Sequence, residues 1–263
     1  MFKKQSVKSV FEKVNITLPQ SWQALTDRQL RYFFRLVARD LPLPEVLALC
    51  AARWANITML GCSSPRFFWV KDKRTGRKFR LAHWQWTFAA RQLAFLESFS
   101  SRPVRLAAVQ GAEAVAADLR GVPFENYLAL ENFYQGFLHT QSMDCLGEMA
   151  QLLYPAMKGK PTRAELLSVF YWFASVKDLF TRSFPHFFSF APTDGGNLLG
   201  DAAQGLGDTL RQAMNAQIRA LTGGDITKEQ SVLAMDCWRA LTELDAKARE
   251  AENFRRKGIG DWG

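Results

Sequence analysis

The chain has 263 residues, which is enough for one large domain or two small ones, and its hydrophobic fraction of 48% is ordinary for a globular protein. The net charge of +9 favours an acidic partner, such as nucleic acid, an anionic surface or an acidic protein. The apolar runs are too short to cross a bilayer, and no apolar run follows the N-terminal lysines. We therefore expect no transmembrane helix, no secretory signal and a cytoplasmic location.

Metal-binding and catalytic patterns are not visible in the sequence. The cysteines are widely spaced without a C-x-x-C motif, and the three histidines lie far apart, so no local zinc pattern can be assembled. No nucleophile, base and acid stand close together either. We therefore predict reduced, mostly buried thiols, no cofactor and no enzyme activity. The cysteines are Cys50, Cys62, Cys145 and Cys237, and the histidines are His83, His139 and His186.

The N-terminal part begins with a basic arm over residues 1–18, which is either a solvated terminus or a tether to an acidic partner. Thr26 and Gln29 then fit a capping box that starts a helix with arginines along one face. Those arginines form either a solvent-exposed face of the helix or a contact to phosphates. A second helix is expected over residues 45–57, and the two should pair as a helical hairpin.

Residues 66–81 differ in kind from the rest of the chain. They predict a β-hairpin, because aromatic and β-branched residues precede a turn at Gly76 and alternating residues follow it. The cations of this hairpin outnumber its one acid, Asp72, by 7 − 1 = 6 charges out of the total of +9. Either they bind phosphates while the aromatic rings contact bases, or they prevent the ribbon's edges from pairing with other sheets. The candidate binding residues are Arg66, Lys71, Lys73, Arg74, Arg77, Lys78 and Arg80.

The most apolar helix is predicted to start at Thr162, which fits a capping box with Glu165, and to run to Arg182. A helix that is apolar nearly all round is buried by several neighbours, so we expect it to be the hub of the fold. The predicted neighbours are helices at 26–40, 125–140 and 142–154, with the aromatic segment 184–190 sealing one end. Lys177 lies away from the helix's polar stripe and must reach solvent or meet a carboxylate.

The C-terminal part follows a glycine-rich linker at 191–207 that has neither P-loop nor G-x-G-x-x-G spacing. Two helices are expected over 208–252, the second begun by a capping box of Thr227 and Gln230 and followed by a disordered tail at 253–263. The second helix carries a narrow apolar seam that suits packing against one partner helix, either the preceding helix or a second chain. The seam consists of Leu233, Cys237, Leu241, Leu244 and Ala248.

These elements predict a mainly α fold, namely a multi-helix orthogonal bundle with one small basic β-hairpin and a C-terminal helical hairpin. The expected organisation is an arm (1–18), a helical core domain (19–190) that includes the hairpin, the linker, the helix pair and the tail.

Several stretches together resemble a family of uncharacterised proteins encoded in prophage-like elements of gut bacteria. They are SWQALTDRQLRYFFRL (21–36), GVPFENYLALENFYQGF (121–137), DGGNLLG (194–200) and MNAQIRALTGGDITKEQSVLAMDCWRALTELDAKARE (214–250). The resemblance implies a phage-derived virion-structural or tail-assembly protein that acts through protein–protein contacts, in the host cytoplasm or in association with the virion. Its partners would be other virion proteins or a second copy of the chain. The alternative is a nucleic-acid-binding protein that uses the basic 66–81 hairpin.

Overall fold

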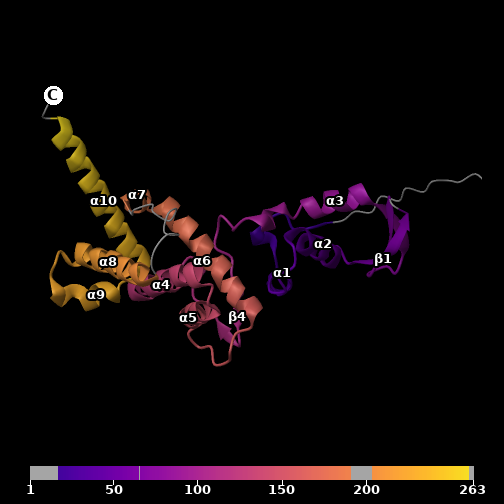
Figure 1. Cartoon of the computed structure of the whole chain (residues 1–263), viewed down its shortest axis with the longest axis horizontal. Coiled ribbons are helices and arrows are strands. Elements are labelled where there is room, and N and C mark those ends of the chain that lie inside the picture. The colour runs from indigo at the N-terminus through magenta and orange to yellow at the C-terminus, as the bar shows by residue number, and fades with distance from the viewer. Residues whose placement is uncertain (1–16, 65, 191–202, 261–263) are drawn as a thin grey trace, which may run out of the picture. The chain divides into compact units, whose positions relative to one another are not determined.

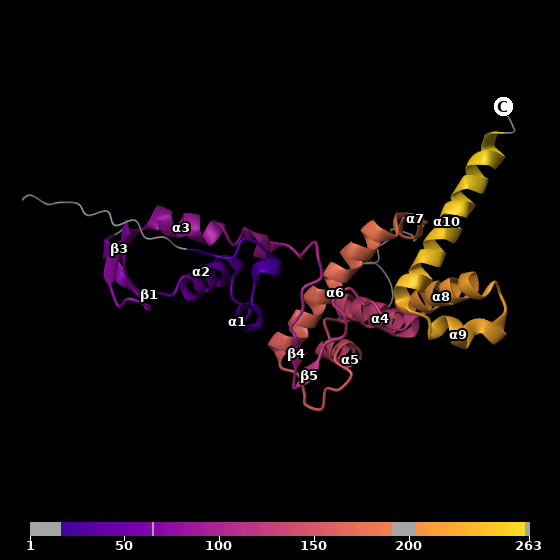
Figure 2. The same ribbon diagram turned by 180° about the vertical axis from the view of Figure 1, so that it is seen from behind.

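The structure, a computed structural model, describes residues 17–64, 66–190 and 203–260, and it confirms the mainly α fold with a small antiparallel sheet (Figures 1 and 2). The described residues divide into two compact units. The smaller unit contains residues 17–24 and 42–96, and the larger unit contains residues 25–41, 97–190 and 203–260. Residues 1–16 of the predicted arm (1–18) and residues 191–202 of the predicted linker (191–207) lie outside the described residues.

The smaller unit is built from two helices and a three-stranded antiparallel sheet with β2 at its centre. A short 3-10 helix at Trp22–Ala24 is held by the Trp22 indole N–H, which donates to the Phe95 carbonyl at 2.8 Å. The core combines residues of both helices with one face of the sheet, including Cys50, Val70 and Trp86. The elements are α2 (Leu43–Trp54), β1 (Ile57–Ser64), β2 (Phe67–Asp72), β3 (Lys78–Ala82) and α3 (His83–Arg91).

The larger unit is organised around α6 (Arg163–Ser183), as the sequence predicts for its most apolar helix. Thr162 and Glu165 form the predicted capping box, and Thr26 and Gln29 form the one that starts α1. The helices α1 and α5 pack on α6, and aromatic rings of α4 contact Phe170, Phe173 and Phe180. Other members are α1 (Asp27–Val37), α4 (Phe124–Thr140), α5 (Met143–Leu153), α7 (Pro185–Phe190) and a two-stranded ribbon of β4 (Ala108–Val109) and β5 (Ala112–Glu113).

The C-terminal helices belong to the larger unit rather than to a separate part, which corrects the predicted organisation. Backbone hydrogen bonds tie them to the start of α4: the N–H of Phe124 donates to the Met235 carbonyl at 2.7 Å, and that of Cys237 to the Val122 carbonyl at 2.9 Å. The helices α9 and α10 lie beside α4 (Figure 2). The elements are α8 (Ala203–Thr222), a 3-10 turn (Ile226–Lys228), α9 (Glu229–Leu233) and α10 (Cys237–Gly260).

Several predicted boundaries are wrong for identifiable reasons. The final helix is broken between Leu233 and Cys237, and the predicted third capping box is absent because Asp225, not Thr227, caps that turn. Residues 203–207 and 253–260, predicted as linker and tail, are helical. The predicted core domain at 19–190 is also divided, since α1 belongs to the larger unit and α2 to the smaller one. These two helices therefore do not form one hairpin within a single domain.

Candidate nucleic-acid interface

The sheet of the smaller unit has two chemically different faces. In an antiparallel pair, residues directly opposite each other share a face, and successive residues along a strand alternate between faces. The pairing places Val70 opposite Phe79 and Phe68 opposite Leu81 on one face. Val70 and Leu81 are buried, and Phe68 stacks on the His83 imidazole with ring centroids 3.9 Å apart. This inner face therefore supplies the core of the unit.

The opposite side, which we call the outer face, consists of Phe67, Trp69 and Lys71 of β2 with Lys78 and Arg80 of β3. Trp69 is 42% exposed, although it lies on the central strand. The Arg80 guanidinium lies over both rings, 5.3 Å from the centroid of Phe67 and 5.7 Å from that of Trp69. Cations and aromatic rings thus alternate on one open surface, as they do on surfaces that contact phosphates and bases.

Lys71 and Lys78 are directly opposite each other on the outer face. Like charges in directly opposed positions destabilise a sheet, so this pair contributes nothing favourable to the fold. Neither lysine, nor Lys73 in the following turn, makes an ion pair within the described part of the chain. Their positive charge is therefore available to an anionic ligand.

A hollow of about 380 Å³ opens on the outer face and crosses all three strands. A β-bulge creates its β1 side, because two residues of β1, Leu60 and Gly61, oppose the single residue Trp69 of β2. Gly61 has a φ of +148°, a value that favours glycine at this position. The lining residues are Leu60, Gly61, Cys62, Trp69 and Lys78.

Asp72 is the one acid of residues 66–81, and its carboxylate is hydrogen-bonded within the β2–β3 turn. Its carboxylate accepts hydrogen bonds from the Thr75 hydroxyl at 2.8 Å and from the Arg74 backbone N–H at 2.7 Å. These bonds, led by that of the Thr75 side chain, lower the pKa of Asp72, so the carboxylate stays ionised within the turn. It neutralises none of the lysines through an ion pair.

The seven cations predicted as binding residues therefore lie in three different parts of the sheet. Lys71, Lys78 and Arg80 meet on the outer face, whereas Lys73, Arg74 and Arg77 lie on the exposed β2–β3 turn, and Arg66 precedes β2. The sequence prediction missed β1 and named no ring as a site residue. The signal for the rings was present, because the alternation in FFWVK places Phe67, Trp69 and Lys71 on one face of a strand.

The predicted partner seam is filled within the chain. Cys237, Leu241 and Leu244 are buried, while Ala248 is half-buried on the same helix and Leu233 lies in α9. The helix α10 packs chiefly on α7, where the Phe187 backbone N–H donates to the Asp245 carboxylate at 2.9 Å. The buried seam residues are thus inaccessible to a second chain.

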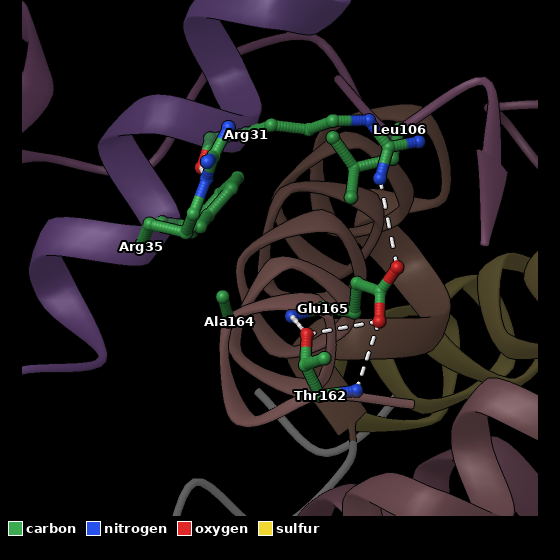
Figure 3. A pocket seen from close by; sticks show the side chains of 7 residues that line it. Arg31, Arg35, Leu106, Thr162, Ala164 and Glu165 are labelled. Carbon is green, nitrogen blue, oxygen red and sulfur yellow. Dashed lines mark hydrogen bonds and ion pairs between the residues drawn. The ribbon is translucent and has the colours of Figure 1, made fainter. Parts of the chain in front are cut away.

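A second pocket, of about 280 Å³, lies in the larger unit between α1 and the start of α6 (Figure 3). Two of its charged groups are paired: Arg31 donates to Asp27 at 2.7 Å and lies 3.5 Å from the Glu165 carboxylate. The Arg35 side chain donates to the Arg31 backbone carbonyl at 3.2 Å. Burial raises the pKa of Glu165, but hydrogen bonds from Thr162 and Gln110 and the charge of Arg31 outweigh it and hold that pKa below its usual value. This mutual pairing makes the pocket a structural junction. Its lining residues are Arg31, Phe34, Arg35, Leu106, Thr162, Ala164 and Glu165.

The described residues hold no group of metal ligands and no membrane-spanning helix. Within 17–64, 66–190 and 203–260, no three residues among histidine, cysteine, aspartate and glutamate cluster as metal ligands would. No helix of the described chain combines the length and apolarity needed to span a bilayer. Comparisons with protein-family models, curated proteins and solved structures gave no match. The outer face, with its exposed ring and its lysines without an acidic partner, is the candidate binding surface.

Proposed function

We propose that the chain binds nucleic acid through the outer face of the β1–β3 sheet. The observation that carries the proposal is the direct opposition of Lys71 and Lys78 beside the exposed ring of Trp69. The opposed lysines cost the fold stability, and a phosphate between or beside them would remove that cost. The rings beside them present flat faces to bases.

Protection of the sheet's edges accounts for Lys78 and Arg80, which lie on the edge strand β3, but not for Lys71 and Trp69. Charges that prevent edge-to-edge aggregation are useful on edge strands, whose N–H and C=O groups are unpaired. Lys71 and Trp69 lie on β2, which is hydrogen-bonded on both sides by β1 and β3. Their exposure on the central strand is therefore better explained by a ligand than by edge protection.

The test is a salt titration of oligonucleotide binding by the full chain, followed by fluorescence anisotropy. Replacing Lys71, Lys73 and Lys78 together with glutamine should weaken binding and reduce the slope of log K against log salt by about 2 to 3. A matched variant with Lys158, Lys160 and Lys247 replaced by glutamine has the same net charge, and these exposed lysines lie in the larger unit. Absence of binding at low salt, or equal losses in both variants, would contradict the proposal.

A structural or assembly role in a phage particle, as the sequence resemblance implies, is the second candidate. It is favoured by Trp84 and Phe88, which lie one turn apart on α3 and are 71% and 65% exposed. Exposed aromatic side chains of this kind are enriched at protein interfaces. Co-purification of virion proteins with the wild-type chain, and their loss with Trp84→Ala and Phe88→Ala, would support it. A strictly monomeric chain that recovers no virion protein would argue against it.

A further inference from the structure

We infer that the ligand of the outer face is a single-stranded nucleic acid, one of whose unpaired bases stacks on Trp69 within the hollow. The inference rests on the proposed function and specifies its ligand. In a duplex, the faces of the bases are already stacked on one another, so an aromatic platform gains little from them. In a single strand they are accessible, and stacking on a ring is nearly independent of base identity.

The hollow has room for a base beside the ring. It measures about 380 Å³, and an added Cβ at Gly61 would meet no atom within 4 Å, so the space above the bulge is open. Leu60 is 47% exposed at the same place, which leaves apolar surface for a base to cover. A flat, mostly apolar object bounded by Trp69 and Leu60 matches this shape.

The charges surround the hollow in the positions that a sugar–phosphate backbone requires. Lys78 lines the hollow itself, and Lys71 lies directly opposite Lys78 on the neighbouring strand. The Arg80 guanidinium lies on the other flank of Trp69, between that ring and Phe67. A base on Trp69 would thus have cations on both sides for its adjoining phosphates, and this charge complementarity identifies the occupant as an anionic strand.

The first experiment compares two probes on the full chain: a labelled single strand of about 12 nucleotides and the duplex of the same sequence. Wild-type protein should prefer the single strand, and Trp69→Ala should weaken single-strand binding by about tenfold while changing duplex binding little. Trp69→Phe keeps a ring and should retain most of the affinity. Trp84→Ala removes another exposed tryptophan of the same unit, on α3, and should have no effect.

The second experiment needs no variant. Cys62 lines the hollow and is exposed, whereas Cys145 is half-buried in the larger unit. Saturating single strand should slow alkylation of Cys62 by iodoacetamide severalfold and leave the rate at Cys145 unchanged. Cys50 and Cys237 are buried, and burial raises the pKa of each thiol to about 12, so both should react slowly throughout.

The outcomes separate the inference from the proposed function. Equal binding of both probes, with Trp69→Ala weakening neither and Cys62 unprotected, overturns the stacked base but leaves nucleic-acid binding standing. Absence of binding to either probe overturns both. Single-strand preference that is lost in Trp69→Ala and kept in Trp69→Phe, together with protection of Cys62, supports both.

Discussion

The two units differ in how they use their charged side chains. In the larger unit, cations meet carboxylates of the same unit, as in Lys177 with Glu131 and Arg163 with Asp40. In the smaller unit, Lys71 and Lys78 oppose each other without an acid. The larger unit thus uses charge to join its helices, whereas the smaller one presents charge outward. Lys71 and Lys78, whose charges are paired with no acid, are therefore better candidates for binding a ligand than Lys177 or Arg163.

The aromatic side chains show the same contrast. In the larger unit, Phe173 is fully buried, and its ring contacts those of Tyr127 and Tyr134. In the smaller unit, Trp84 and Phe88 are more than half exposed. The Phe173 ring therefore stabilises the fold, whereas the Trp84 and Phe88 rings are accessible to partners.

The largest change in stability is expected when a buried aromatic ring of the larger unit is removed. Phe173→Ala should lower the free energy of unfolding by about 3–5 kcal/mol, because it removes a buried ring and leaves a cavity between α4 and α6. Phe88→Ala, the matched change at an exposed ring, should alter it by no more than about 0.5 kcal/mol. Denaturant unfolding followed by circular dichroism measures both. Comparable losses of stability in the two variants would show that the exposed Phe88 ring also stabilises the fold.

The next effect concerns the ion pair that links α4 to α6. Lys177→Met should destabilise the protein by about 1–3 kcal/mol, because it leaves the Glu131 carboxylate without its cation. One oxygen of that carboxylate is already buried without a hydrogen bond, and the other is shared with the Gln135 amide at 2.7 Å. Adding Glu131→Leu should restore much of the loss, since an apolar pair removes the unpaired charge.

The control for that pair lies in the smaller unit. Lys71→Met should leave the unfolding midpoint unchanged or raise it, because Lys71 faces another lysine rather than an acid. The same substitution in the two units therefore has opposite expected consequences. A marked destabilisation by Lys71→Met would contradict the view that this charge is unused by the fold.

The smallest effect depends on pH. The folded-state pKa of Glu165 lies below its ordinary value of 4.5, so its contribution is full above about pH 5 and is lost as the pH falls through the folded-state pKa. Glutamine keeps the capping box, as Gln29 does in α1, but it removes the charge that faces Arg31. Glu165→Gln should thus cost up to about 1 kcal/mol at neutral pH and nothing in acid. Thermal unfolding over this range checks it, with exposed Glu148→Gln as the control. A difference that persists at low pH would contradict the assignment.

Hydrogen bonds were predicted best from the sequence where the donor and acceptor residues are close along the chain. The capping boxes of Thr26 and Thr162 formed because each needs only residues within one helical turn. The prediction at Thr227 failed for the same kind of reason, since Asp225, two residues earlier, accepts hydrogen bonds from both the backbone N–H and the hydroxyl of Thr227. Of the two alternatives predicted for Lys177, solvent or a carboxylate, the structure shows the carboxylate: it is that of Glu131, 46 residues away.

The strand β1 was missed because nothing local defines it. The segment ITMLGCSS is short, lacks alternation and follows a helix without proline or glycine between them. It becomes a strand by pairing with β2, after Asn56 ends the helix region with a φ of 56°. Without β1, residues 66–81 appeared to be a two-stranded ribbon, and neither the hollow nor the central position of Trp69 could be predicted.

The mainly α class, the hub helix and the concentration of charge in residues 66–81 are all predictable from the amino-acid sequence. These follow from apolar periodicity, capping residues and composition, all of which are read from neighbouring positions. Three facts emerge from the three-dimensional structure alone: α1 and α2 belong to different units, the buried residues of the α10 seam are covered by their own chain, and Lys71, Lys78 and Trp69 share one open face. Those facts depend on strand register and on contacts between distant segments, which no local pattern encodes.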